Sequence, residues 1–312
     1  MNNRIEHILF AGSSVFSKNI LADLLQYPIK TLNVLTQPDR PSGRGKALAP
    51  TAVKDFALSQ HINCFSPIAL DDRAHDEILS MQRPDLMIVV AYGLLIPEWL
   101  IEWPALGAIN IHTSLLPRWR GASPIQSALK SGDKETGITI MRVSKKLDEG
   151  NIIYQSKLST EGIKNTEELS LLMEEEAKVY FKDLFNDATI DLSGVPQNHG
   201  EATYCQKIKK TDGLIDWNNS ALSIFNLIRA YNPWPMAYSF INADSRIRII
   251  EAEVIEEDHH FLPGQVIEFN KKHLVVACKE NALKLVKVQL DGGKVITHKD
   301  LFNSGKNISR FG

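Results

Sequence analysis

The chain has 312 residues, of which 44% are hydrophobic and 23% are charged. This length exceeds one typical compact domain, and these proportions exclude a disordered or fibrous protein. The formal net charge of −2 does not indicate nucleic-acid binding by the chain as a whole, so any such function depends on local charge.

Strand and helix signals alternate in the first half of the chain. Strands are predicted at His7–Ala11, Leu32–Thr36, Asp85–Ala91, Ala108–His112, Gly137–Val143 and Ile152–Leu158. Helices are predicted at Phe16–Leu25, Ala52–Leu58, from Pro124 onward, and at Thr166–Phe185. Such alternation predicts an α/β domain with a doubly wound, mostly parallel sheet.

The second half follows a different pattern. Residues 187–203 contain glycine, proline and asparagine with little periodicity, which is typical of a linker. Beyond it, a helix at Ser220–Tyr231 precedes several strands without intervening helices, and this predicts a small antiparallel barrel. Those strands are expected at Ala237–Ile241, Arg246–Ile255, Gly264–Phe269, His273–Cys278 and Leu283–Leu290. We therefore expect a first domain at 1–189, a linker at 190–206 and a second domain at 207–312.

Cysteine content and hydropathy bound the setting of the protein. Cys64, Cys205 and Cys278 are far apart and form no CxxC pair, which argues against a disulfide framework and a zinc site, and no metal is predicted. The longest apolar run, Leu86–Pro97, is shorter than the ~18–20 residues that span a bilayer, and the N-terminus has no signal peptide. We expect a soluble, cytoplasmic, monomeric protein without membrane contact.

Asn110 and His112 are the first candidates for chemistry. They are two residues apart on a predicted strand, so their side chains project from the same face. The carboxyl end of a parallel strand is where open α/β sheets bind ligands. On spacing alone, a hydrogen-bonded core histidine explains His112 equally well.

Two loops follow that strand. The loop from Ser114 to Ile125 holds two prolines, a glycine, two arginines and a tryptophan, and it is longer and more varied than an ordinary strand-to-helix connection. Asp148 follows the strand predicted at Gly137–Val143. A loop aspartate is usually a cap or turn residue, but beside a histidine it can stabilise the protonated imidazole.

The sequence resembles the formyltetrahydrofolate-dependent formyltransferases. The resemblance rests on Asn110-Ile-His112 with Ser114-Leu-Leu-Pro117 and Leu147-Asp148. Four further motifs narrow it to the methionyl-tRNA branch: residues 36–46, Val90-Ala-Tyr92-Gly93, residues 116–121, and Asn232-Pro-Trp-Pro-Met236. It extends from about His7 to Asn303. The chain departs from the family pattern at Ser13, Thr113, Glu149 and Asn151, and at Lys145-Lys146 before Leu147, but it keeps Asn110, His112 and Asp148.

The resemblance implies a Rossmann-like first domain, an OB-like second domain and an activity. The formyl donor would be 10-formyltetrahydrofolate, a reduced folate, and the acceptor would be initiator methionyl-tRNA. The implied catalytic residues are Asn110, His112 and Asp148. The folate would bind at the carboxyl edge of the sheet, against Tyr92, Gly93, Leu94, Ile96, Ser114, Leu115, Leu116 and Pro117. The implied tRNA contacts are Arg40, Arg44 and Lys46, and a second basic cluster, Lys207, Lys209 and Lys210, could follow the phosphate backbone.

Other functions remain to be compared with this one. A glycinamide ribonucleotide or sugar-nucleotide formyltransferase shares the Asn, His and Asp, but neither is expected to carry the basic stretch at 39–46. A nicotinamide-dependent oxidoreductase needs G-x-G-x-x-G after the first strand, whereas this chain has Gly12-Ser-Ser-Val-Phe-Ser. An RNA-binding module without catalysis leaves Asn110, His112 and Asp148 unexplained. Taken alone, a basic loop is often only a solvated surface.

Overall fold

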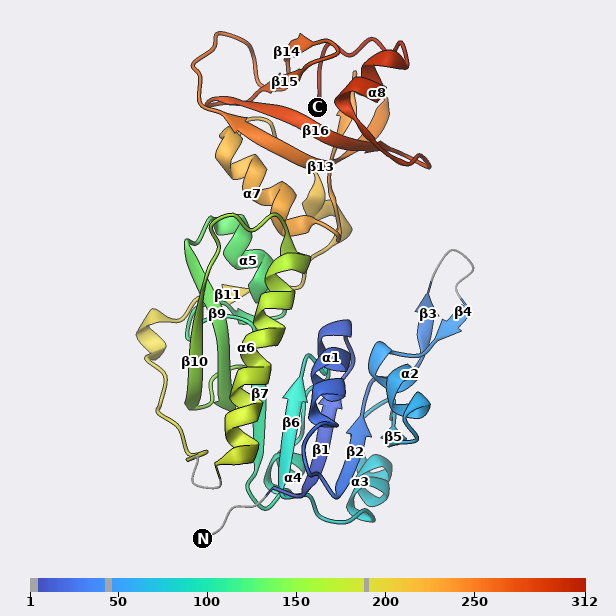
Figure 1. Cartoon of the computed structure of the whole chain (residues 1–312), viewed down its shortest axis with the longest axis vertical. Coiled ribbons are helices and arrows are strands. Elements are labelled where there is room, and N and C mark those ends of the chain that lie inside the picture. Colours follow the sequence, from blue (N-terminus) through green and yellow to red (C-terminus); the bar gives the residue numbers. More distant parts are fainter. Residues whose placement is uncertain (1–4, 43–46, 188–190) are drawn as a thin grey trace. The chain divides into compact units, whose positions relative to one another are not determined.

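The computed structural model describes residues 5–42, 47–187 and 191–312, which form two compact units (Figure 1). The first unit comprises the residues up to Gly121 together with 136–158 and 170–204, and the second comprises 122–135, 159–169 and 205–312. Two short segments that precede the predicted linker, 122–135 and 159–169, thus belong to the second unit. The predicted domain limits at 189 and 206 assign these two segments to the first domain, and those limits stay a prediction.

A seven-stranded sheet organises the first unit. Its strand order is β10-β9-β7-β6-β1-β2-β5, and the pairs β1–β2, β1–β6, β2–β5 and β6–β7 are parallel, whereas β7–β9 is antiparallel. This confirms the mostly parallel, Rossmann-like sheet. The strands are β1 (His7–Gly12), β2 (Thr31–Leu35), β5 (Asn63–Phe65), β6 (Leu86–Val90), β7 (Ala108–His112), β9 (Glu135–Arg142) and β10 (Ile152–Ser159).

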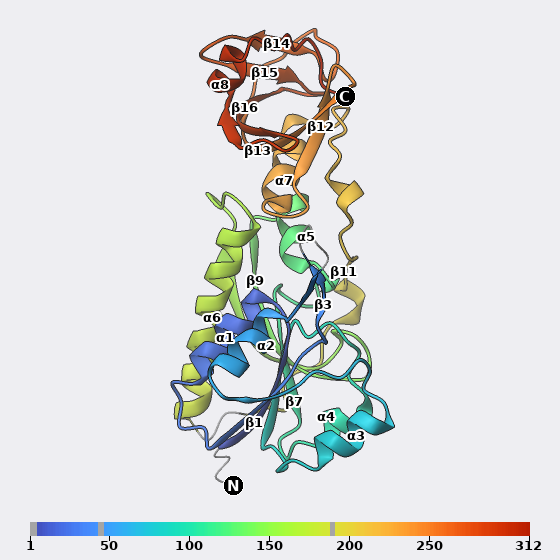
Figure 2. The same ribbon diagram turned by 90° about the vertical axis from the view of Figure 1, so that its right-hand side faces the viewer.

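Helices cover both faces of this sheet. Figure 2 shows α1, α2 and α6 on one side of the strands and α3 and α4 on the other. The helices are α1 (Val15–Leu24), α2 (Ala52–Ser59), α3 (Asp72–Leu79), α4 (Glu98–Glu102) and α6 (Thr166–Asn186). All five residues of β6 are buried, as a parallel strand covered on both faces requires. This arrangement leaves the carboxyl ends of the parallel strands, β1, β2, β5, β6 and β7, at one edge.

Several short elements were not predicted from the sequence. In the first unit these are the strand β5, the helices α3 and α4, and the hairpin of β3 (Arg40–Ser42) and β4 (Ala47–Ala49). The two-residue strands β8 (Arg120–Gly121) and β11 (Tyr204–Cys205), which pair with each other, were not predicted either. Helix α3 buries only Ala74 and Ile78 among polar neighbours, so its apolar pattern is short. Its start is nevertheless a local signal, because the Asp71 side chain accepts from the Ala74 N–H.

The second unit is an antiparallel sheet with helices. Its sheet runs β12-β13-β16-β15-β14, and β17 pairs with β16. The helix α5 (Pro124–Ser131) packs on α7 (Ala221–Tyr231), which places residues 122–135 in this unit. The other elements are β12 (Ala237–Ile241), β13 (Ser245–Ile255), β14 (Val266–Phe269), β15 (Leu274–Ala277), β16 (Ala282–Leu290), β17 (Val295–Thr297) and α8 (His298–Asn303).

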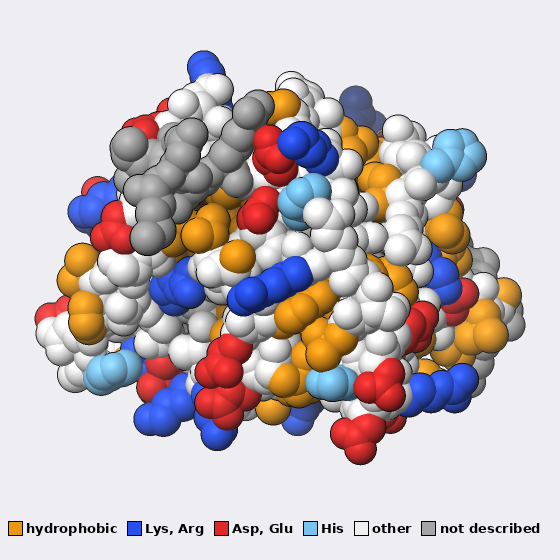
Figure 3. All heavy atoms as spheres, turned by 90° about the horizontal axis from the view of Figure 1, so that it is seen from below, with side chains coloured by type: hydrophobic (Ala, Val, Ile, Leu, Met, Phe, Trp, Pro, Cys, Tyr) orange, Lys and Arg blue, Asp and Glu red, His pale blue; other side chains and the backbone are white. Residues whose placement is uncertain are grey.

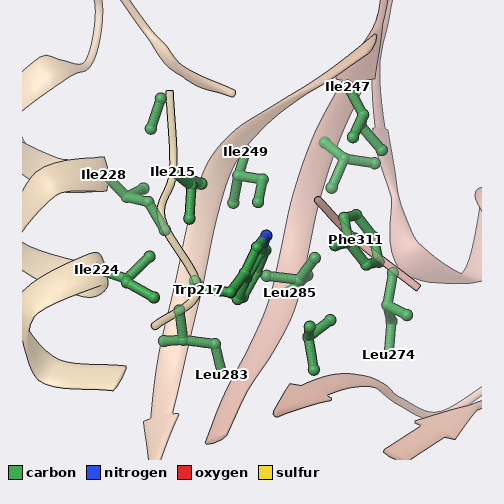
Figure 4. Packing of buried hydrophobic residues seen from close by; sticks show 14 of the residues in the cluster. Ile215, Trp217, Ile224, Ile228, Ile247, Ile249, Leu274, Leu283, Leu285 and Phe311 are labelled. Atoms are coloured by element: carbon green, nitrogen blue, oxygen red, sulfur yellow. The ribbon is translucent and has the colours of Figure 1, made fainter. Parts of the chain in front are cut away.

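The C-terminal segment joins the two edge strands of this sheet. Phe311 forms a bridge with Ile241 at the end of β12, and Arg310 forms one with Gln265 next to β14. The sheet thereby closes on itself, which confirms the predicted antiparallel barrel. Its core is drawn in Figure 4, where Trp217 lies among aliphatic side chains from α7, β13 and β16 and near Phe311. The indole N–H of Trp217 donates to the Ser239 hydroxyl at 3.0 Å, so the buried polar group is satisfied.

Helix α6 carries a buried carboxyl group that limits stability at neutral pH. Glu174 is 5% exposed, and burial raises its pKa, while the hydrogen bond from Asn19 at 2.8 Å lowers it. Because the pKa of Glu174 is higher in the folded state than in the unfolded state, the folded state loses stability as the pH rises from the unfolded-state pKa through the folded-state pKa. We expect Glu174→Gln to raise the urea midpoint of unfolding at about pH 7 and to raise it less at about pH 4, near the ordinary carboxyl pKa. An equal or larger gain at the lower pH would contradict this assignment.

Candidate functional site

Strand β7 brings two candidate side chains to the carboxyl edge of the first unit's sheet. Asn110 and His112 lie two residues apart and therefore share a face, as predicted. His112 is buried, with 5% of its surface exposed, and Asn110 is half-buried. Within the described residues, the Asn110 carboxamide has no hydrogen-bond partner. Its N–H groups are therefore available to a ligand.

Both ring nitrogens of His112 face protein groups. Nε2 lies 2.9 Å from the carbonyl oxygen of Trp119, and a carbonyl only accepts, so Nε2 carries a proton and donates it. Nδ1 lies 3.7 Å from Oδ2 of Asp148. This distance is too long for a hydrogen bond but places a carboxylate beside the imidazole. The sequence-predicted His112 and Asp148 are thus brought together.

Asp148 occupies a constrained position in the loop after β9. Its φ angle is +55°, in the left-handed region that few residues other than glycine adopt, although aspartate tolerates it better than most. The side chain is buried at 8% exposure, and Oδ2 accepts from the backbone N–H of Gly121 at 2.8 Å. The carboxylate is therefore held by the loop that follows β7.

The 114–117 segment is tied to the neighbouring strand. The Thr139 hydroxyl donates to the Ser114 carbonyl at 2.6 Å and accepts from the Leu116 N–H at 3.0 Å. Ser114 and Leu116 are buried, and the Ser114 hydroxyl donates to the Arg118 carbonyl at 2.6 Å. Leu115 and Pro117 are half-buried. Of the four residues in this segment that were predicted to contact folate, Leu115 and Pro117 therefore have accessible side chains.

The segment after β6 divides in the same way. Tyr92 is buried, and its carbonyl accepts from the Gln37 side chain at 2.7 Å and from the Ser13 hydroxyl at 3.1 Å. Burial raises the pKa of the Tyr92 phenol well above its ordinary value. Gly93 is exposed at φ +82°, where an added Cβ would lie 2.3 Å from Gln37 Nε2.

The remaining predicted folate residues, Leu94 and Ile96, are half-buried and pack on a core cluster that includes buried residues of α3 and α4. Leu95, which lies between them, is 77% exposed. Gln37 and Ser13 were not among the predicted site residues. Their hydrogen bonds join the ends of β1, β2 and β6, and no local pattern indicates that connection.

The predicted tRNA residues lie in two different units. Arg40 is exposed on β3 in the first unit, in a hairpin where the sequence indicated a loop, whereas Arg44 and Lys46 lie outside the described residues. Lys207, Lys209 and Lys210 are exposed in the second unit, and within the described chain their ammonium groups form no ion pair with a carboxylate, although the Lys209 backbone N–H donates to Asp212 at 2.8 Å.

Among the residues that the structure describes, no group of three or more His, Cys, Asp or Glu side chains is placed to hold a metal ion. None of the helices in the described ranges is both long and apolar enough to cross a membrane.

Comparison with known proteins agrees with this geometry. Residues 5–182 match the family model for formyl transferase, and residues 207–306 match that for the formyl transferase C-terminal domain. The chain is 40% identical over 299 residues to the methionyl-tRNA formyltransferase of Pseudomonas putida, covering 95% of each, and 42% identical over 305 residues to that of Marinobacter nauticus, covering 96% of this chain and 97% of the relative.

Among solved structures, the fold is similar to an N-formyltransferase from Helicobacter canadensis, with a TM-score of 0.66, 17% identity, and coverage of 90% of this chain and 98% of that one. It is also similar to methionyl-tRNA formyltransferase from Clostridium thermocellum, with a TM-score of 0.53, 18% identity, and coverage of 80% and 94%. The matched family models and the identity over nearly the whole chain lead to one conclusion: this chain belongs to the formyl transferase family, among the methionyl-tRNA formyltransferases.

Proposed function

We propose that this chain transfers the formyl group of 10-formyltetrahydrofolate to the α-amino group of methionyl-tRNA, giving N-formylmethionyl-tRNA for translation initiation. The main structural support for this proposal is that Asn110 and His112 lie on one face of β7 at the carboxyl edge of the sheet, with the Asp148 carboxylate 3.7 Å from the imidazole. The high identity to proteins named methionyl-tRNA formyltransferase supports this acceptor.

The reaction requires charge stabilisation more than activation of the nucleophile. An α-amino group has a pKa of about 7.7–8.0, so a sizeable fraction is neutral near pH 7. Attack on the formyl carbon forms a C–N bond and an oxyanion. Collapse then breaks the bond between that carbon and the folate nitrogen, which gains a proton while the new amide nitrogen loses one.

The three residues have complementary roles in this proposal. The unpartnered Asn110 carboxamide donates to the oxyanion. His112 donates its Nε2 proton to the same centre, exchanging its present bond to the Trp119 carbonyl for one to the substrate. Asp148, whose Oδ2 lies 3.7 Å from Nδ1, orients the imidazole and takes part in moving the proton from the amine.

The accessible surfaces of two loops define the folate site in this proposal. They are the exposed Gly93 and Leu95 after β6 and the half-buried Leu115 and Pro117 after β7. A flat heterocycle suits apolar walls with backbone hydrogen-bonding groups. Tyr92, Ser114 and Leu116 support these walls from beneath, because their side chains are buried.

The proposal also covers the roles of the two domains, the oligomeric state and the location of the enzyme. Residues 1–189 supply the catalytic domain and 207–312 the tRNA-binding domain, and the enzyme acts as a cytoplasmic monomer. Acidic and basic side chains are interspersed on the face in Figure 3, in keeping with a net charge of −2. Recognition of tRNA therefore depends on local clusters of cations.

An acceptor panel tests the proposed function. The wild-type enzyme and 10-formyltetrahydrofolate are incubated with methionyl-tRNA, uncharged tRNA, glycinamide ribonucleotide or an amino-sugar nucleotide. We expect formylated product with methionyl-tRNA at a kcat/KM far above that of the other amines, and none with uncharged tRNA. Preferred formylation of the sugar-nucleotide or glycinamide amine would replace this function with that of another branch of the family.

The lysine cluster provides a prediction on tRNA binding. If Lys207, Lys209 and Lys210 each neutralise a phosphate, replacing all three with glutamine should lower the log–log salt slope of tRNA binding by about 2–3. The measurement is the dissociation constant for methionyl-tRNA over a series of salt concentrations. The control is Lys271→Gln/Lys272→Gln, two exposed lysines of the same unit. Equal slopes in the wild type and the triple variant would remove the cluster from the interface.

A further inference from the structure

A buried glutamine in the predicted linker contacts the backbone of the Asp148 loop. Residues 195–204 belong to the first unit, although the sequence indicated a linker at 190–206 (Figure 1, yellow). Within residues 191–200, Gln197 alone is buried, at 5% exposure. Its amide nitrogen donates to the carbonyl oxygens of Asp148 at 2.9 Å and of Gly150 at 2.8 Å.

The other end of the same amide is held by a buried arginine. Gln197 Oε1 accepts from Arg120 Nε at 3.1 Å and from Nη2 at 2.7 Å. Both donors and both acceptor positions of the amide are therefore used, and this fixes its orientation. If the amide were flipped, its oxygen would face two carbonyl oxygens and its N–H groups would face two guanidinium N–H groups. Arg120 is 1% exposed, and Glu149 lies 3.5 Å from its Nη1. A buried guanidinium needs such partners to be stable.

Gly121 and Gln197 hydrogen-bond to Asp148 at its side chain and at its backbone, respectively. Gly121, the residue after Arg120, donates its N–H to the Asp148 carboxylate at 2.8 Å, while Arg120 acts through Gln197 on the Asp148 carbonyl. On the other side of the loop Gly150 packs closely against the end of β9, since a Cβ there would lie 1.8 Å from the Arg142 carbonyl oxygen. The left-handed backbone of Asp148 is thus held at its carbonyl and its side chain, and the carboxylate faces His112 Nδ1 at 3.7 Å.

The 195–204 segment is itself held by hydrogen bonds on both sides of Gln197, at Val195 and at Thr203. Val195 and Ile152 exchange backbone hydrogen bonds of 2.8 Å each. Thr203 accepts from the Trp119 N–H through its hydroxyl and from the Arg120 N–H through its carbonyl, both at 2.9 Å. Gln197 therefore has a fixed base from which to hold the Asp148 loop.

We propose that Gln197, oriented by Arg120, is a positioning residue that sets the Asp148 carboxylate against His112. This inference rests on the role given to Asp148 in the proposed function. Gln197 does not touch the reacting atoms, and it acts through the backbone of residues 148–150. A displacement of a catalytic group by about 1 Å can lower a rate by about 10²-fold.

The first test separates rate from binding. Gln197→Ala should lower kcat for formylation of methionyl-tRNA by about 10–100-fold, while KM for folate and for tRNA changes by less than about 3-fold. The matched control is Asn198→Ala, the next residue, whose exposed side chain bonds only within residues 198–201. A Gln197→Ala enzyme with wild-type kcat, or with only KM raised, would overturn the proposal.

A double-mutant cycle provides the readout that a merely structural role would not produce. In an Asp148→Ala background, adding Gln197→Ala should change kcat by less than about 3-fold, because the positioned group is already absent. Effects that multiply would overturn the proposal and leave the proposed function standing. If Asp148→Ala alone keeps wild-type kcat, the role of Asp148 fails and this inference fails with it.

A second variant covers loss of folding. If thermal unfolding shows Gln197→Ala to be unfolded, Arg120→Met/Gln197→Met removes the buried charge together with its partner, which costs less than leaving the charge unpaired. This folded variant should show the same fall in kcat. Wild-type kcat in it would overturn the proposal.

Discussion

Replacing His112 with alanine is expected to lower kcat by about 10²–10⁴-fold, the usual range for loss of an acid–base group. Asp148→Ala should fall in the same range, because the carboxylate lies 3.7 Å from Nδ1 and is buried with the imidazole. Since the two act as a unit, the double variant should be little slower than either single one. The measurement is steady-state formylation of methionyl-tRNA at saturating folate.

A surface histidine provides the control for this pair. His75 on α3 lies 3.1 Å from the Asp76 carboxylate, but both side chains are exposed. His75→Ala should retain wild-type kcat, which separates the effect of the site from that of any His–Asp contact. Near wild-type kcat in folded His112→Ala and Asp148→Ala enzymes would show that the chemistry takes place elsewhere.

Replacing Asn110 with alanine is expected to lower kcat by about 10²–10³-fold, as for loss of one oxyanion donor. The physical reason is that its carboxamide has no hydrogen-bond partner within the described chain and shares a strand face with His112. Asn110→Asp should be slower still, because a carboxylate would face the developing oxyanion. KM for both substrates should stay within about 3-fold, since the interaction forms only in the transition state.

Asn63→Ala is the matched control, because Asn63 is an exposed amide on β5 of the same sheet that bonds to Asn33. It should leave kcat unchanged. If Asn110→Asp is as fast as the wild type, Asn110 does not face the oxyanion.

The main strands and the placement of Asn110 and His112 on one strand face followed from local patterns. Ala108–His112 is both the predicted and the observed range of β7, because apolar residues bounded by loops indicate a buried strand. The period of two along a strand then places Asn110 and His112 together. The long helix α6 was also predicted to within a residue at its end, since its apolar pattern repeats over many turns.

The supporting contacts of the site could not be predicted in this way. Gln197 is separated from Arg120 by 77 positions in the sequence and lies in a stretch without periodicity. No local pattern therefore distinguishes a buried, hydrogen-bonded glutamine from a residue of an exposed linker. The Ser13–Gln37–Tyr92 connection depends likewise on three strands that meet only in the folded sheet. Short elements such as α3, which buries two side chains, give too few apolar positions for a clear period.

The most direct measurement follows a labelled formyl group from 10-formyltetrahydrofolate to methionyl-tRNA in the wild type and in a folded Asn110→Ala/His112→Ala/Asp148→Ala variant. After deacylation, the wild type should yield labelled N-formylmethionine. The variant should bind both substrates but form product more slowly by at least about 10²-fold. No labelled N-formylmethionine from the wild type, or equal rates from the two enzymes, would contradict the assignment of methionyl-tRNA formylation to this site.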